Sequence, residues 1–172
     1  MKNNNRNIKR RLYRLSLIGN HLSRIKHFRG HGVHSPFVYG LVRSVFMTRR
    51  GLHDEPSHFV ESLVAVGVAL RRAVQLEGAM QYSNASTYVI DSVACNADFC
   101  ILSPKCDVRE FATAYQSALA NGSTLVICQP YATQERQKEV MRLVELHRCT
   151  SVDNRAYILF FNNKLPKQHF KL

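Results

Sequence analysis

Short apolar runs alternate with helical patterns through the second half of this chain, and this alternation restricts the fold more than any other feature of the sequence. Runs rich in β-branched and aromatic residues occupy residues 87–90, 99–102, 124–128 and 156–161. Such runs are typical of strands that are buried on both faces of a sheet. Helical spacing of apolar positions is found between them, over residues 107–121 and 133–147. The alternation predicts an α/β fold with a parallel or mixed sheet of four to five strands.

The first half of the chain has helical patterns only. Apolar residues recur near helical spacing over residues 5–27, which predicts a basic amphipathic helix. Ser35 followed by Pro36 is a typical start of a helix, which we expect over residues 36–47. A single long helix is expected over residues 57–80, with Val64 and Leu70 among its inward positions.

The net positive charge is confined to the N-terminal part of the sequence. Residues 1–53 contain 12 basic residues (Lys or Arg) and no acidic ones (Asp or Glu), whereas residues 54–172 contain 12 basic and 12 acidic residues. The formal net charge of +12 is therefore entirely N-terminal. We therefore expect a basic helical segment over residues 1–56 and an α/β domain over residues 57–172, which together form one compact unit.

The basic segment is a candidate for binding an anion or a nucleic acid. Its candidate contact residues are Lys9, Arg10, Arg11, Arg14, Arg24, Lys26 and Arg29. Cations interleaved with rings can follow phosphates while the rings stack on bases. An acidic protein partner, an anionic membrane surface and a plain solvated helix explain the same pattern, because charge reports on association and not on fold.

The cysteines indicate a reducing compartment. There are five of them, none in a CxxC pair, and an odd number leaves at least one thiol outside any disulfide scheme. We expect a cytoplasmic protein, because no apolar stretch near the N-terminus is long enough for a signal peptide or a membrane span. The Arg-rich start also fits an organelle transit peptide. Cys106 follows Lys105, which could lower the pKa of its thiol.

Five segments together resemble one known family. The most specific of them is His31-Gly32-Val33-His34-Ser35-Pro36-Phe37-Val38-Tyr39. The others cover residues 98–102, 124–128, 157–161 and 167–171. They resemble, in this order, the N-terminal signature, the fourth strand, the fifth strand, the closing strand and the tail of a family of S-adenosylmethionine-dependent methyltransferases of Bacteroidetes-type bacteria.

The resemblance implies a reduced doubly wound, Rossmann-like sheet with S-adenosylmethionine as cofactor. Ligands of such sheets bind at the carboxyl ends of the strands. Asp91 and Ser103 are therefore the candidates for binding the cofactor. The candidates for binding the substrate are Gln129, Tyr131, His31 and His34. His31 and His34 also fit a turn that packs before the helix, and we expect no metal site.

The expected function is that of a divergent methyltransferase-family protein with impaired catalysis. The sequence has no Gly-rich turn after a first strand, and residues 103–106 and 129–131 supply no carboxylate at the strand ends. The alternative is a non-enzymatic basic module that binds nucleic acid or an acidic protein. A shortened sheet also exposes an edge, which a partner or a second copy of the chain could cover.

Overall fold

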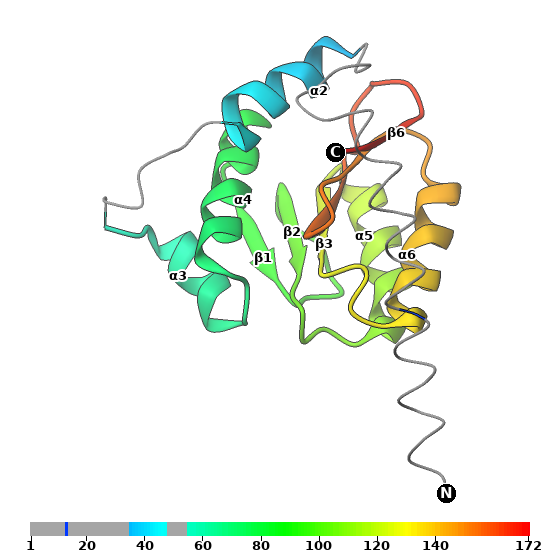
Figure 1. Ribbon diagram of the computed structural model, residues 1–172. Helices are drawn as coiled ribbons and strands as arrows, with labels where there is room; N and C mark the ends of the chain where they lie inside the picture. Colours follow the sequence, from blue (N-terminus) through cyan, green and yellow to red (C-terminus); the bar gives the residue numbers. More distant parts are fainter. Residues whose placement is uncertain (1–12, 14–34, 48–54) are drawn as a thin grey trace, which may run out of the picture.

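The chain has an α/β fold with a six-stranded mixed, largely parallel sheet (Figure 1). The computed structural model describes residues 13, 35–47 and 55–172. The α-helices of this part are α2 (Pro36–Leu41), α3 (His58–Ala65), α4 (Leu70–Tyr82), α5 (Phe111–Asn121) and α6 (Gln134–Leu146). The strands are β1 (Tyr88–Ile90), β2 (Phe99–Leu102), β3 (Thr124–Cys128), β4 (Thr150–Asp153), β5 (Tyr157–Phe160) and β6 (Gln168–Lys171). A π-helical turn, η2 (Val42–Phe46), continues α2, and a 3-10 turn, η3 (Val108–Glu110), precedes α5.

The strands lie in the order β1-β2-β3-β5-β4-β6. β1, β2 and β3 are parallel neighbours, β5 runs antiparallel to both β3 and β4, and β6 pairs parallel to β4. The expected α/β class is confirmed, but the expected number of four to five strands is too low. The two additional strands are β4 and β6, whose polar residues gave no apolar run in the sequence.

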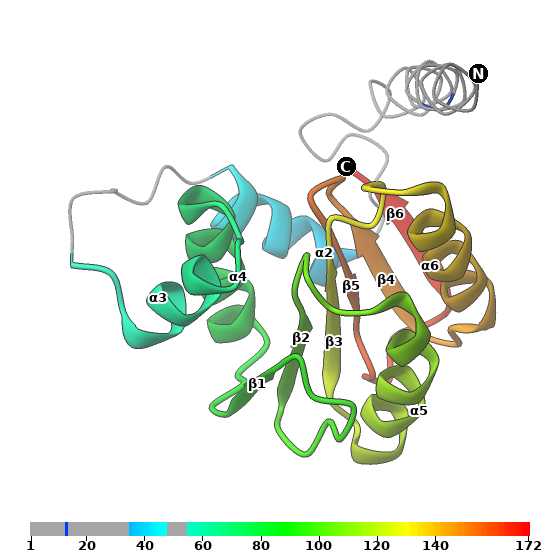
Figure 2. The same ribbon diagram turned by 90° about the horizontal axis from the view of Figure 1, so that it is seen from below.

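Helices cover both faces of the sheet (Figure 2). α2, α3 and α4 lie on one face, and α5 and α6 on the other. Side chains alternate along β3 accordingly: Val126 and Cys128 pack in the core on the α4 side, while Leu125 and Ile127 pack in the core on the α5 side. This two-sided burial explains why β3 is an uninterrupted apolar run.

Two helix boundaries follow the local sequence signals. The Ser35 hydroxyl accepts the Val38 N–H at 3.4 Å, and Pro36 is the first residue of α2, as expected. Gly122 ends α5 in the left-handed conformation, with a φ of 70°. These signals place the two helices without any reference to tertiary packing.

The single helix expected over residues 57–80 is wrong. The chain forms α3 and α4 instead, and the break lies at Gly67, whose φ of +96° is incompatible with a right-handed helix. Val64 and Leu70 are exposed by 43% and 45%, so the expectation that they face inward is wrong as well; Leu70 starts α4, on the far side of the break.

Several expectations lie outside the described residues. They concern the helix over residues 5–27 (Tyr13 excepted), the seven candidate anion-binding cations, His31 and His34. None of the helices in the described part of the chain has the length and hydropathy needed to span a membrane.

Candidate functional site

The carboxyl ends of the parallel strands form the edge of the sheet at which α/β proteins bind ligands. Asp91 follows β1, Ser103 follows β2 and Gln129 follows β3 on this carboxyl edge. β4 runs in the same direction and ends there with Asp153. The strand-end residues that the sequence singled out are therefore placed along a common edge.

Asp91 and Ser103 lie in direct contact. Asp91 has a φ of +52°, and its N–H donates to the Ile101 carbonyl at 2.8 Å, which extends the pairing of β1 with β2. Its carboxylate Oδ1 accepts the Ser103 N–H at 2.7 Å. Asp91 is exposed while Ser103 is fully buried. The carboxylate thus bridges the ends of two strands and still reaches solvent.

Gln129 and Tyr131 lie in the connection from β3 to α6. Gln129 has a φ of +47°, and its N–H donates to the Ala156 carbonyl at 2.7 Å, which ties the end of β3 to the β4–β5 turn. The Tyr131 hydroxyl donates to the buried Asp153 carboxylate. The hydroxyl of Tyr13 donates to the Tyr131 carbonyl oxygen at 3.1 Å, so Tyr13 contacts this edge.

Arg136, on the first turn of α6, is the central polar residue of the carboxyl edge, and sequence reasoning missed it. Its side chain is buried, with 4% exposed. Nη2 donates to the Ser103 carbonyl at 2.7 Å and to the Cys128 carbonyl at 2.9 Å, and Nη1 donates to the Cys106 carbonyl at 2.9 Å. One guanidinium therefore holds the end of β3 and both ends of the loop after β2.

The surroundings of Arg136 combine an aromatic ring with backbone oxygens. The guanidinium carbon lies 4.6 Å from the centre of the Phe111 ring, a cation–π contact. Burial lowers the pKa of Arg136. The sequence did carry a signal: Arg136 is four residues before Val140 and seven before Leu143, the two fully buried apolar positions of α6, so helical spacing places it on the inward face.

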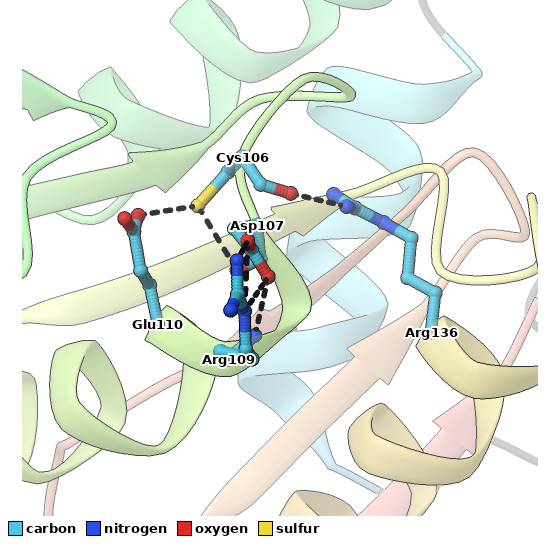
Figure 3. A network of polar contacts seen from close by, with 5 residues as sticks. All are labelled: Cys106, Asp107, Arg109, Glu110 and Arg136. Carbon is cyan, nitrogen blue, oxygen red and sulfur yellow. Dashed lines mark hydrogen bonds and ion pairs between the residues drawn. The ribbon is translucent and has the colours of Figure 1, made fainter.

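The thiol of Cys106 is not activated. Its Sγ lies 3.4 Å from the Glu110 carboxylate, and its backbone carbonyl accepts from Arg136 on the other side (Figure 3). Burial first, and the Glu110 contact second, raise the pKa of the thiol to about 12. The expected lowering by Lys105 is wrong, because the Lys105 ammonium points to the Ala65 carbonyl at 3.4 Å. A thiolate nucleophile at this position is disfavoured.

An exposed ion pair lies beside Cys106. Arg109 pairs with Asp107, whose side chain also accepts the Arg109 N–H at 2.9 Å and so caps η3 (Figure 3). The Arg109 hydrogen bonds lower the pKa of Asp107 to about 2. The two partners are only two residues apart, so the pair is a local contact within the loop after β2. Exposed pairs of this kind stabilise a fold only weakly.

Metal binding finds no support in the described part of the chain. No group of three or more His, Cys, Asp or Glu residues is placed to hold an ion there. The five cysteines are all free. What the carboxyl edge offers chemically is the exposed carboxylate of Asp91, beside a cation whose hydrogen bonds go to backbone carbonyls.

Comparison with known proteins gives no match: no family model, no curated protein and no solved structure is significantly similar to this chain.

Proposed function

We propose that this protein is a nucleic-acid-binding module, in which a reduced, methyltransferase-like α/β body carries a polycationic N-terminal segment. The observation that carries the proposal is the separation of charge: all 12 units of net charge belong to residues 1–53, while the rest of the chain is neutral. A run of cations without acids gains affinity for a phosphate backbone by releasing its counterions.

The carboxyl edge supports a binding role over a catalytic one. The carbonyls at the ends of β2 and β3 are bound by Arg136, and Asp91 bonds to the backbone of Ser103. Cys106, the one nucleophile considered at this edge, has a raised pKa. A methyl transfer needs donor and acceptor held in line, and these groups are engaged with the protein itself.

The test is the binding of a fluorescent 20-nucleotide single strand, measured by anisotropy against salt concentration. The variant replaces Lys9, Arg10, Arg11, Arg14, Arg24, Lys26 and Arg29 by Gln. The matched control replaces seven cations of the body, namely Arg71, Lys105, Arg109, Lys138, Arg142, Arg148 and Lys164. We expect the N-terminal variant to lose at least about tenfold in affinity and most of the salt slope, which is about 0.7 per phosphate contact for single strands, and the control to keep both.

Two results would overturn nucleic acid as the partner. One is equal loss in the variant and in the matched control, because the charge of the segment would then not be special. The other is equal affinity for polyglutamate of the same charge, which would indicate an acidic protein partner instead.

A second candidate function is retained binding of S-adenosylmethionine at Asp91. The observation that favours it is the exposed carboxylate at the end of β1, in contact with Ser103 on the neighbouring strand. Asp91 and Ser103 would then hold the cofactor, and Gln129 and Tyr131 would lie on the acceptor side. Calorimetric titration with S-adenosylhomocysteine should give heat that Asp91→Asn abolishes; no heat at about millimolar ligand would exclude this candidate.

A further inference from the structure

A hollow lies at the opposite edge of the sheet, where the parallel strands begin. This amino-edge cavity has a volume of about 320 Å³. It lies among the ends of α4 and α5, the starts of β2 and β3, and the segment after β5. The lining residues on which the argument depends are Phe37, Tyr82, Phe161, Asp98, Asn84 and Asn162. None of these residues belongs to the carboxyl edge.

Aromatic rings form one side of the amino-edge cavity. The ring centre of Phe37 lies 5.3 Å from that of Tyr82 and 5.1 Å from that of Phe161. The Tyr82 hydroxyl donates to the Phe37 carbonyl at 3.0 Å, which fixes the orientation of its ring. Ring faces held in this way attract a planar cation.

Hydrogen-bond acceptors form the other side. Oδ2 of Asp98 accepts from the N–H and hydroxyl groups of Ser86 and Thr87, each at 2.9 Å, while Oδ1 makes no hydrogen bond within the described residues. These bonds lower the pKa of Asp98 to about 2, so the carboxylate is ionised at neutral pH.

An amide adds a second unused acceptor. Nδ2 of Asn162 donates to the Ser123 carbonyl, whereas Oδ1 is buried and has no hydrogen-bond partner among the described residues. A buried acceptor without a donor is costly, and a ligand donor would relieve that cost. The side chain of Asn84 adds a further exposed amide at the cavity.

Charge selects the ligand class. Of the described residues that line the amino-edge cavity, Asp98 is acidic and none is Lys, Arg or His. The cavity therefore favours a cation with several donors. A guanidinium group fits better than an ammonium group, because it is flat, weakly hydrated and offers five N–H donors, while an ammonium is a strongly hydrated point charge.

We propose that the amino-edge cavity binds a guanidinium group, which stacks on Tyr82 and donates to Asp98 and Asn162. The group can belong to a small guanidine compound or to an arginine side chain of a polypeptide. The inference is independent of nucleic-acid binding, since it uses neither the seven N-terminal cations nor the carboxyl edge.

The first experiment is a calorimetric titration of the full chain with methylguanidinium and with a blocked Gly-Arg-Gly peptide, beside the citrulline and lysine peptides. We expect both guanidinium probes to bind saturably with a dissociation constant of about 1 mM. The citrulline peptide should bind at least about tenfold more weakly. A peptide that binds at least about tenfold tighter than methylguanidinium identifies a polypeptide arginine, and equal affinities identify the head group alone. Equal binding of the citrulline peptide, or no saturation by about 20 mM of either guanidinium probe, overturns the proposal.

The second experiment changes the cavity with a matched pair of variants. Ser83 ends α4 at the amino-edge cavity, and a cation at a helix C-terminus is compatible with the fold. Ser83→Lys should weaken binding at least about tenfold by placing a charge beside Asp98, while Ser83→Gln, similar in length, should change it less than about threefold. Unchanged binding in Ser83→Lys, or equal loss in both variants, would contradict a charge-selected site.

Discussion

The two edges of the sheet differ in how far their polar groups are used by the protein itself. At the carboxyl edge, Arg136 binds the carbonyls of Ser103, Cys106 and Cys128, and Asp91 accepts from the backbone of Ser103. At the amino edge, Asp98 Oδ1 and Asn162 Oδ1 stay unbonded within the described residues, beside a cavity. At the edge favoured by topology the strand-end carbonyls are bonded internally, although the buried Tyr157 hydroxyl there has no hydrogen-bond partner among the described residues.

In most α/β proteins the carboxyl edge has both properties that a binding site needs: strand-end loops and polar groups without an internal partner. Parallel strands place loops and strand-end groups at the carboxyl edge, which makes it the usual binding site. Binding also needs groups that have no better partner inside the protein, because a satisfied carbonyl gains nothing from a ligand. Here two such acceptors, Asp98 Oδ1 and Asn162 Oδ1, lie beside a cavity at the amino edge.

Among variants at the two edges, Arg136→Met at the carboxyl edge should have the largest effect on the free energy of unfolding. The apolar replacement keeps the volume but removes the Arg136 donor from the Cys106 and Cys128 carbonyls, while the Ser103 carbonyl keeps the Cys106 N–H at 3.2 Å. Each buried acceptor without a partner costs about 1–3 kcal/mol. We expect the free energy of unfolding to fall by about 3–5 kcal/mol, measured by urea denaturation.

Arg142→Met is the control, because Arg142 lies on the same helix and pairs with Glu139 at the surface. It should change the free energy of unfolding by less than about 1 kcal/mol. If Arg136→Met were as mild as Arg142→Met, the carboxyl edge would not depend on this guanidinium.

Gly40→Ala tests the aromatic side of the amino-edge cavity and should have the next largest effect. A methyl group at Gly40 would collide with the Tyr82 hydroxyl and lie 3.2 Å from the adjoining ring carbon. Alanine favours a helix over glycine by about 1 kcal/mol, so a net loss of about 1–2 kcal/mol would show that the clash outweighs propensity. Calorimetric unfolding of Gly40→Ala, Tyr82→Phe and the double variant measures this. The double variant should recover part of the loss, and strict additivity would argue against the contact.

A buried histidine should make stability depend on pH. His147 follows α6 near the start of β4, is 1% exposed, and packs against Tyr115, whose hydroxyl lies 3.1 Å from Nδ1. Burial lowers the pKa of His147. Below about pH 6.5 the unfolded imidazole binds a proton that the folded one excludes, so the free energy of unfolding should fall as the pH falls.

The measurement is urea unfolding between about pH 5 and about pH 7.5. The slope assigned to His147 is at most about 1.4 kcal/mol per pH unit, and His147→Gln should remove it. His58 is exposed, so His58→Gln should keep the slope. A slope that survives in His147→Gln would assign the titration to another group.

Local signals were enough to predict much of the fold. The apolar runs gave β1, β2, β3 and β5, and the caps at Ser35 and Gly122 gave helix ends, because each depends on a few neighbouring residues. β4 and β6 were missed because their residues are polar and depend on pairing partners distant in sequence. Gly67 was expected to lie within one continuous helix over residues 57–80, but its positive φ separates α3 from α4.

The sequence could predict only those parts of the candidate site whose position follows from the order and direction of the strands. Asp91 and Ser103 were placed near one another because consecutive parallel strands end at one edge, and their contact follows. Arg136 was missed because a cation on an inward helical position contradicts the usual preference for exposure. The amino-edge cavity joins Phe37 to Asn162 across most of the chain, and no local pattern predicts such a contact.

The smallest effect should come from relieving left-handed backbone at the two edges. Gln129 and Asn84 both have positive φ, of 47° and 55°. Glutamine is strained there, whereas asparagine tolerates this conformation, and glycine adopts it freely while losing more entropy on folding. Gln129→Gly should therefore raise the free energy of unfolding by about 0.5–1 kcal/mol, and Asn84→Gly by less than about 0.5 kcal/mol. Chemical denaturation of the two variants in parallel measures the difference. A larger gain at Asn84 than at Gln129 would mean that the amino edge, with its unused acceptors, is also the more strained of the two.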